Sequence, residues 1–194
     1  MSLYKDQHYI DLAINGDLNA FATLMDRYKH MVYTLALRTV RNKEEAEEIA
    51  QDTFLKVYKG LKGFKGTSKF STWVYKITYN KSLDYIKKRS KKLETYALDV
   101  NAEQFMGSVE DITERLGRQD RKVIIGQALL QLPEKDGFLI TLHYYEELSL
   151  TEIASVMNES TNTIKVRLFR ARNRLAKILS ERLAPETIHS YGRK

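Results

Sequence analysis

The sequence contains no cysteine, and it has only two prolines and nine glycines among 194 residues. The absence of cysteine excludes disulfide bonds and thiolate metal sites, and it fits a reducing compartment such as the cytoplasm. Because helix breakers are so rare, long stretches run uninterrupted, and their apolar residues recur at spacings of three and four rather than two. This periodicity predicts an all-α protein.

Long hydrophobic runs and clustered metal ligands are also missing. Apolar runs such as residues 123–125 are far shorter than the roughly 20 residues of a membrane span, and the first residues, MSLYKDQHYIDL, lack the apolar stretch of a signal peptide. We therefore expect neither membrane insertion nor export. The four histidines are scattered, and the one Glu-x-x-His motif, Glu186 to His189, follows Pro185 in a terminal tail. We expect no catalytic residue, no metal, no cofactor and no small-molecule substrate.

The positive charge is concentrated in one stretch. The chain carries a net charge of +7, and residues 69–92, with eight basic residues and one acid, account for all of it. The lysines interleave with aromatic residues in FSTWVYKITYNKSLDYIKKRSKK, which begins at Phe70. Such a balance indicates a polyanionic partner, either nucleic acid or a membrane surface. A membrane-binding helix needs one broad apolar face, whereas helical spacing places Trp73 and Ile77 opposite the tyrosines, so nucleic acid is favoured.

Four helices are predicted in the first half of the chain. The second carries an apolar stripe from Phe21 to Ala36, and the third has acids in its first turns, where the helix dipole favours them. The glycine-rich basic loop GLKGFKG follows, and Ser71 is expected to cap the fourth helix. The first helix is expected at residues 6–15 and the fourth at 72–90, and the second is placed by its apolar stripe. The third is expected at 43–58, with these residues facing inward: Ala46, Ile49, Ala50, Thr53 and Val57.

The composition changes at residue 94. Residues 94–120 contain seven acids and two arginines, without a sustained apolar period, which indicates a flexible acidic linker. Residues 121–185 resume a helical pattern. We therefore predict two small helical domains, residues 1–93 and 121–185, joined by this linker and followed by a tail at 186–194.

The strongest local pattern lies between Ser149 and Leu183. Ser149 and Glu152 form a capping box for a short helix, and Ser160 or Thr161 caps a longer helix after a brief turn. The longer helix has an apolar stripe from Ile164 to Ile178, and residues 160–177 contain several basic residues and no acid. A basic helix is often no more than a solvated face. Here the missing acids, the caps and the preceding short helix predict a helix-turn-helix whose second helix enters the major groove of DNA.

These residues resemble the bacterial extracytoplasmic-function (ECF) sigma factors of the sigma-70 family, the promoter-recognition subunits of RNA polymerase. AEEIAQDTFLKVYKGLKGF is similar to their core-binding helix, FSTWVYKITYNKSLDYIKKR to their minus-10 segment, and LPEKDGFLITLHYYEELSLTEIASVMNESTNTIKVRLFRARNRL to their minus-35 domain. The resemblance implies core RNA polymerase and promoter DNA as partners, with an anti-sigma factor as a further candidate, in the bacterial cytoplasm.

The resemblance also implies three sets of site residues. The core-binding set is Gln51, Asp52, Phe54 and Leu55. The minus-10 set, which would hold an opened strand by phosphate contacts and stacking, is Lys62, Lys65, Ser68, Lys69, Trp73, Asn80, Lys81, Lys87 and Lys88. The minus-35 set is Thr163, Lys165, Val166, Arg167, Phe169, Arg170 and Arg174.

Two departures and several alternatives remain open. The family's turn usually has glycine where this chain has Asn162, which tolerates a positive φ, and Val166 replaces a small hydroxyl residue, so the promoter sequence cannot be taken from the family. Trp73 is either exposed for stacking or buried against Ile77. The linker either follows the RNA path of the polymerase or is a plain tether. An ordinary helix-turn-helix regulator that binds duplex DNA without polymerase is the alternative function, and an adaptor protein is a third.

Overall fold

The computed structural model describes residues 3–92 and 118–182, and these form eight α-helices, one short 3-10 helix and no strand. The all-α prediction is confirmed. Contacts divide the described chain into two compact units, one with α1 to α4 and residues 151–159, and one with α6, α7 and α9. Each unit is described by itself below. The predicted domain boundaries stay predictions, and nearly all of the acidic linker and the whole tail at 186–194 lie outside the described residues.

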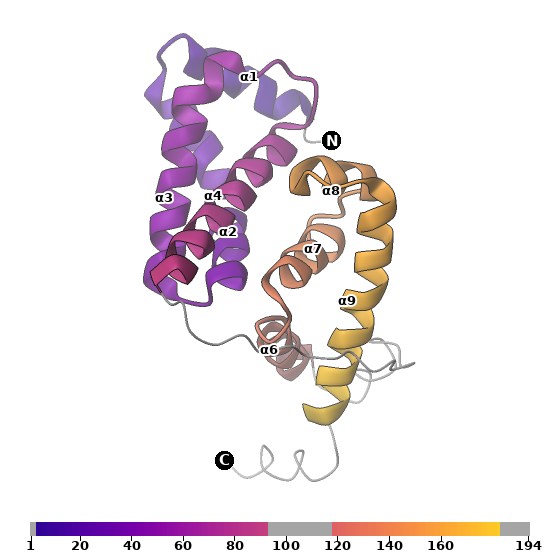
Figure 1. The fold of residues 1–194 in the computed structure, drawn as a ribbon. Helices are drawn as coiled ribbons and strands as arrows, with labels where there is room; N and C mark the ends of the chain where they lie inside the picture. Colours follow the sequence, from indigo (N-terminus) through magenta and orange to yellow (C-terminus); the bar gives the residue numbers. More distant parts are fainter. Residues whose placement is uncertain (1–2, 93–117, 183–194) are drawn as a thin grey trace. The chain divides into compact units, whose positions relative to one another are not determined.

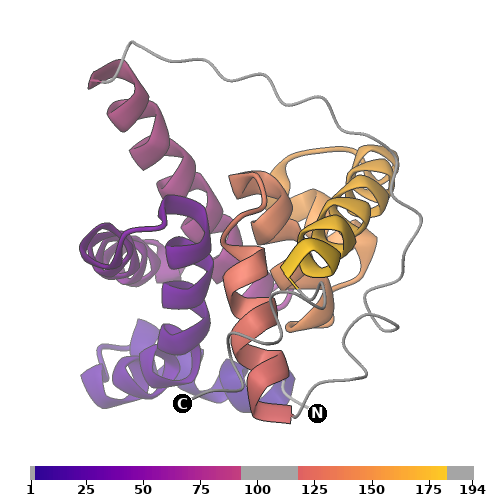
Figure 2. The same cartoon turned by 90° about the horizontal axis from the view of Figure 1, so that it is seen from below.

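The first unit is a bundle in which α2, α3 and α4 pack against one another (Figures 1 and 2). Asp17 caps α2 by accepting bonds from the backbone N–H groups of Asn19 and Ala20, at 2.8 and 3.1 Å. Arg41 adopts a left-handed φ of 60°, and Asn42 then caps α3 through the Glu45 N–H at 2.9 Å, so two residues suffice to reverse the chain. The helices are α1 (Leu3–Ile14), α2 (Leu18–Val40), α3 (Lys43–Gly60), η1 (Leu61–Gly63) and α4 (Phe70–Lys92).

The buried carboxylate of Asp6 links α1 to α2. Asp6 accepts a hydrogen bond from the Tyr28 hydroxyl at 2.5 Å and pairs with the Arg27 guanidinium at 2.7 Å. The same guanidinium lies 4.6 Å from the centre of the Tyr9 ring. Each oxygen of the carboxylate therefore has its own donor, as a buried acid requires.

Helix α4 differs from its prediction in two respects. It begins at Phe70, so Ser71 lies inside the first turn and is not the cap. Ile77, expected on the exposed side with Trp73, is buried together with Thr78 and Tyr79. The physical reason is that α4 packs against both α2 and α3, so two faces of the helix are covered, whereas the predicted pattern allowed for one.

The remaining helices are shorter, except the last. Helix α6 begins at Arg118, so residues 118–120, predicted as linker, are helical. Helices α6 and α7 both contact α9. The helices are α6 (Arg118–Leu129), α7 (Glu134–Tyr144), α8 (Leu150–Met157) and α9 (Thr161–Arg182).

Residues 158–160 form the turn between α8 and α9. Ser160 caps α9, since its Oγ accepts the Thr163 N–H at 3.1 Å and lies 2.8 Å from the Thr163 Oγ1. The left-handed residue is Asn158, with φ of 54°, whereas Asn162 lies inside α9. The expectation that Asn162 supplies the positive φ of the turn is therefore wrong by four positions, although the residue type, asparagine, suits that conformation.

Candidate functional site

An open apolar groove lies between α2 and α3. Leu55 is 57% exposed and Tyr58 is 44% exposed, and the Tyr58 ring contacts Phe21 of α2 edge to face, with 4.9 Å between centroids. Contiguous exposed apolar side chains of this kind mark surfaces that bind other proteins. The apolar residues that line the groove include Leu18, Phe21, Met25, Tyr33, Phe54, Leu55 and Tyr58.

The structure divides the predicted core-binding residues between two places. Gln51, Phe54 and Leu55 line the groove, although Phe54 is only 9% exposed and also belongs to the buried face of α3. Ala50, expected to face inward, is half-buried and lines the groove. Asp52 does not line the groove and faces α4.

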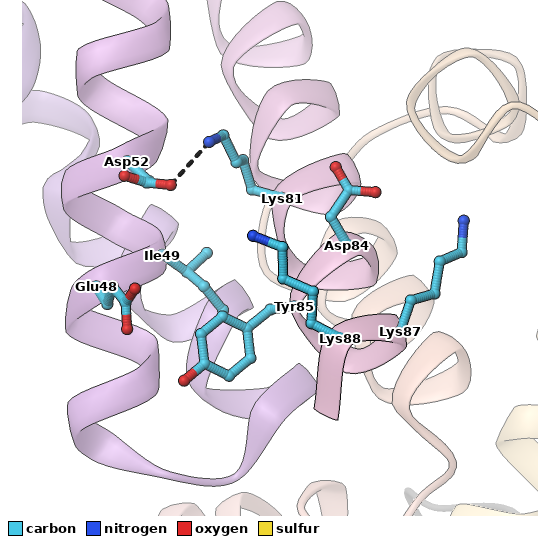
Figure 3. A pocket seen from close by; sticks show the side chains of 8 residues that line it. All are labelled: Glu48, Ile49, Asp52, Lys81, Asp84, Tyr85, Lys87 and Lys88. Carbon is cyan, nitrogen blue, oxygen red and sulfur yellow. Dashed lines mark hydrogen bonds and ion pairs between the residues drawn. The ribbon is translucent and has the colours of Figure 1, made fainter. Parts of the chain in front are cut away.

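Asp52 forms an ion pair with Lys81 of α4, with 2.7 Å between Oδ2 and Nζ (Figure 3). One predicted polymerase contact and one predicted DNA contact are therefore bound to each other. Both side chains remain partly exposed, so water screens their attraction and the pair contributes little to stability.

Basic and acidic side chains meet in the hollow between α3 and α4 (Figure 3). Lys81, Tyr85 and Lys88 extend from α4 toward α3, whereas Lys87 points away from it. Desolvation, followed by the nearby carboxylates of Glu45 and Glu48, raises the pKa of the Tyr85 phenol above its ordinary value. An ordinary tyrosine phenol is already neutral at physiological pH, and the raised pKa favours that neutral, hydrogen-bond-donating form further.

The loop before α4 is basic and exposed, and it leads into an aromatic cluster. The Trp73 ring lies 5.1 Å from Phe64 and 5.8 Å from Phe70, centroid to centroid. A Cβ atom at Gly60 would lie 3.3 Å from the indole, so the absence of a side chain there lets the ring approach the end of α3. The indole is half-buried in this cluster, so it is neither fully exposed nor fully buried. Of the predicted minus-10 residues, Lys62, Lys65, Ser68, Lys69, Lys87 and Lys88 are exposed, and Trp73, Asn80 and Lys81 are half-buried.

Helix α9 presents an exposed face with both apolar and basic side chains. Phe169 is 63% exposed and Val166 is 45% exposed, which is unusual for large apolar residues on a helix that packs against two others. Of the predicted minus-35 residues, Thr163, Lys165, Val166, Phe169 and Arg170 are exposed. Ile164, Leu168, Ala171 and Leu175 of the predicted stripe are buried, with Leu179 rather than Ile178 completing it.

Two predicted minus-35 residues turn toward α7 instead. The guanidinium of Arg174 lies 2.5 Å from the Asp136 carboxylate, and that of Arg167 lies 3.6 Å from it. Asp136 was not recognised from the sequence. The available signal was its position, an acid directly before the apolar run GFLITL, whose residues are all buried in α7.

Within residues 3–92 and 118–182, no group of three or more histidine, aspartate or glutamate side chains could hold a metal ion. No described helix is long and apolar enough to cross a membrane.

Comparison with known proteins identifies the family. The Sigma-70 region 2 family matches residues 24–92, and the Sigma-70 region 4 family matches residues 122–175. The ECF RNA polymerase sigma factor SigW of Bacillus subtilis is 36% identical over 175 residues, covering 86% of this chain and 92% of SigW. The RNA polymerase sigma-H factor of Pseudomonas aeruginosa is 32% identical over 181 residues, covering 90% of this chain and 94% of that factor.

Two solved structures have a similar fold. CnrH in complex with the cytosolic domain of CnrY matches 91% of this chain and 97% of its own, with a TM-score of 0.64 at 21% identity. The sigma factor RpoE in complex with the anti-sigma factor NepR, from Bartonella quintana, matches 84% of this chain and 98% of its own, with a TM-score of 0.64 at 22% identity. The chain therefore belongs to the extracytoplasmic-function sigma factors, the promoter-specificity subunits that bind core RNA polymerase and direct transcription initiation.

Proposed function

We propose that this sigma factor divides its work among three surfaces: the groove between α2 and α3 binds core polymerase, the loop before α4 and the exposed lysines of α4 hold the opened minus-10 strand, and the exposed face of α9 reads the minus-35 duplex. The observation that carries this proposal is the different chemistry of the three surfaces. The groove is apolar, the α4 segment is basic with one half-buried tryptophan, and the α9 face combines arginine, lysine and apolar side chains.

For polymerase binding, Gln51 and Leu55 are the residues to test, because both line the groove and both are exposed. A few residues near the centre of an interface commonly contribute most of its affinity. Replacing both by alanine should weaken the affinity for core polymerase without affecting the fold. Lys56→Ala, also exposed on α3 but outside the groove, is the matched control. If Lys56→Ala weakens binding as much as the double variant, the groove is not the docking surface.

For DNA, the two basic surfaces have different tasks. Lys62, Lys65 and Lys69 precede the half-buried Trp73, an arrangement that suits phosphate contacts beside a displaced base. On α9 we assign Thr163, Lys165, Val166, Phe169 and Arg170 to the duplex. Arg167 and Arg174 are left out of this contact set because their guanidinium groups are paired with Asp136.

The deciding experiment mixes the purified chain with core RNA polymerase on a library of promoter fragments and maps the transcription start sites. A discrete start that depends on the chain supports the proposal. An ordinary helix-turn-helix regulator would instead bind a specific duplex tightly without polymerase, and an adaptor would show no dependence on DNA. Either of those results would contradict the assignment of the three surfaces.

We also propose regulation by an anti-sigma factor, which would act where the polymerase is, in the bacterial cytoplasm. The support is that RpoE of Bartonella quintana, which shares this fold, was solved with the anti-sigma factor NepR. The groove between α2 and α3 offers the exposed apolar surface that such an inhibitor needs. Neither role requires a catalytic residue, and none is assigned.

A further inference from the structure

The side chain of Asp136 is only 3% exposed and lies between two arginines of α9. Its Oδ2 atom lies 2.5 Å from Nη1 of Arg174, and its Oδ1 atom lies 3.6 Å from Nη1 of Arg167. The two arginines are seven residues apart, which is two helical turns, so they project from the same side of α9. One carboxylate on α7 therefore holds two guanidinium groups of the recognition helix.

The cluster lies directly beside the surface proposed to read DNA. Asp136, Arg167 and Arg174 line one hollow together with Thr163, Val166 and Arg170. Arg170 is exposed and forms no ion pair with Asp136, while Arg167 and Arg174 are partly covered. Arg170 therefore points outward, whereas Arg167 and Arg174 lie against α7.

The direction in which these arginines point determines what they contribute to DNA binding. A guanidinium that reaches a phosphate strengthens binding to every sequence equally and releases counterions, which steepens the salt dependence by about 0.9 per phosphate. A guanidinium that reaches a guanine edge discriminates between sequences. Arginines held by a buried carboxylate add to neither term. They do not raise the affinity for DNA of any sequence, and they leave the discriminating contacts to their neighbours.

We propose that Asp136 is a positioning residue that determines the sequence specificity of the recognition helix. By holding Arg167 and Arg174 against α7, it keeps them from the DNA backbone, so that Arg170, with Val166 and Phe169, decides which duplex is preferred. This inference rests on the proposed minus-35 function of α9.

Asp136→Asn in the full chain tests the inference directly, because it removes the charge and keeps the shape. Binding to a random-sequence duplex is measured over a series of salt concentrations. The slope of log affinity against log salt should become steeper by about 1 to 2, since one or two arginines gain phosphate contacts. The affinity for random DNA at low salt should rise. Sequence selection from a randomised minus-35 pool by the holoenzyme should give a less defined consensus.

Glu134→Gln is the matched control. Glu134 lies in the same first turn of α7, is half-buried and undergoes the same change of charge, but it does not pair with either arginine. It should leave the slope unchanged. A purely structural role for Asp136 would lower the thermal stability of Asp136→Asn without steepening the slope, and that result would overturn the inference.

A second pair of variants keeps the test valid if Asp136→Asn does not fold. Lys165→Gln removes an exposed residue of the proposed contact surface, and its slope should become shallower by about 1. Arg174→Gln removes the same charge from a partly covered position, and its slope should not change. A loss of about 1 in the slope of Arg174→Gln would mean that this arginine already contacts phosphate, and it would overturn the inference.

The two proposals fail in different ways. If the wild-type chain and its holoenzyme bind no duplex through α9, so that Lys165→Gln has no effect either, the proposed function of α9 is wrong and the inference falls with it. If Lys165→Gln weakens binding as expected while Asp136→Asn behaves like Glu134→Gln, α9 still reads DNA and only the role of Asp136 is refuted.

Discussion

The two basic helices α4 and α9 are nearly equal in length, 23 and 22 residues, yet they are used differently. Helix α4 packs against both α2 and α3, and its first half is buried on two faces. Helix α9 buries a single stripe and exposes the remainder. Both helices engage basic residues within the fold. On α4, Lys81 pairs with Asp52 and Arg89 bonds to Glu45 and to the Val40 carbonyl; on α9, Arg167 and Arg174 pair with Asp136. Two helices of similar basic character can therefore present their charges differently, because the packing of each helix decides which of its side chains reach solvent.

The largest effect should come from removing one phenylalanine from each helix. Phe70→Ala removes a ring that is 4% exposed and lies 5.5 Å from the Tyr28 ring, so it should lower the free energy of unfolding by about 3–5 kcal/mol. Phe169→Ala removes an exposed ring and should change the free energy of unfolding by no more than about 0.5 kcal/mol. Denaturant unfolding checks both values.

The two units need separate probes in that measurement. The only tryptophan, Trp73, lies in the first unit beside Phe70, so its fluorescence follows that unit, while far-ultraviolet circular dichroism follows the helices of both. If the two substitutions lower the free energy of unfolding by similar amounts, the contrast between α4, covered on two faces, and α9, covered on one, is wrong.

The next effect concerns specificity on α9. Arg170→Ala should change which minus-35 sequences the holoenzyme selects, because an arginine bidentate to guanine contributes about 1–3 kcal/mol of discrimination. Lys165→Ala, on the same exposed face, should instead weaken all sequences alike if it contacts phosphate. Selection from a randomised duplex pool distinguishes the two results. An unchanged consensus with Arg170→Ala would reduce that residue to a backbone contact.

A smaller effect should appear on α4, where the exposed Lys87 and Lys88 lie beyond the buried half of the helix. Replacing both by alanine should reduce promoter opening by the holoenzyme about fivefold, if each phosphate contact contributes about 0.5 kcal/mol. Much of the loss should return on a template with a pre-opened bubble. An equally large defect on the bubble template would reassign these lysines to anchoring of the closed duplex.

The same contrast explains what the sequence could predict. The buried stripe of α9, from Ile164 to Leu175, was readable because a helix covered on one side shows a clean period of three to four. Ile77 was misplaced because a helix with two partners loses that period. The pairs of Asp136 and of Asp52 join residues 38 and 29 positions apart, and no local pattern encodes which distant charges meet.

The smallest effect tests whether the Asp52–Lys81 pair is structural. The two side chains are 50% and 28% exposed, so their coupling in a double-mutant cycle, with Asp52→Asn, Lys81→Met and the double variant, should be about 0.2–1 kcal/mol of unfolding free energy. The coupling should shrink as salt is added, because exposed charges are screened. A coupling well above this range that persists in high salt would mean that Lys81 is locked to α3. Lys81 would then be withdrawn from DNA as Arg174 is, and the two helices would differ less than their packing indicates.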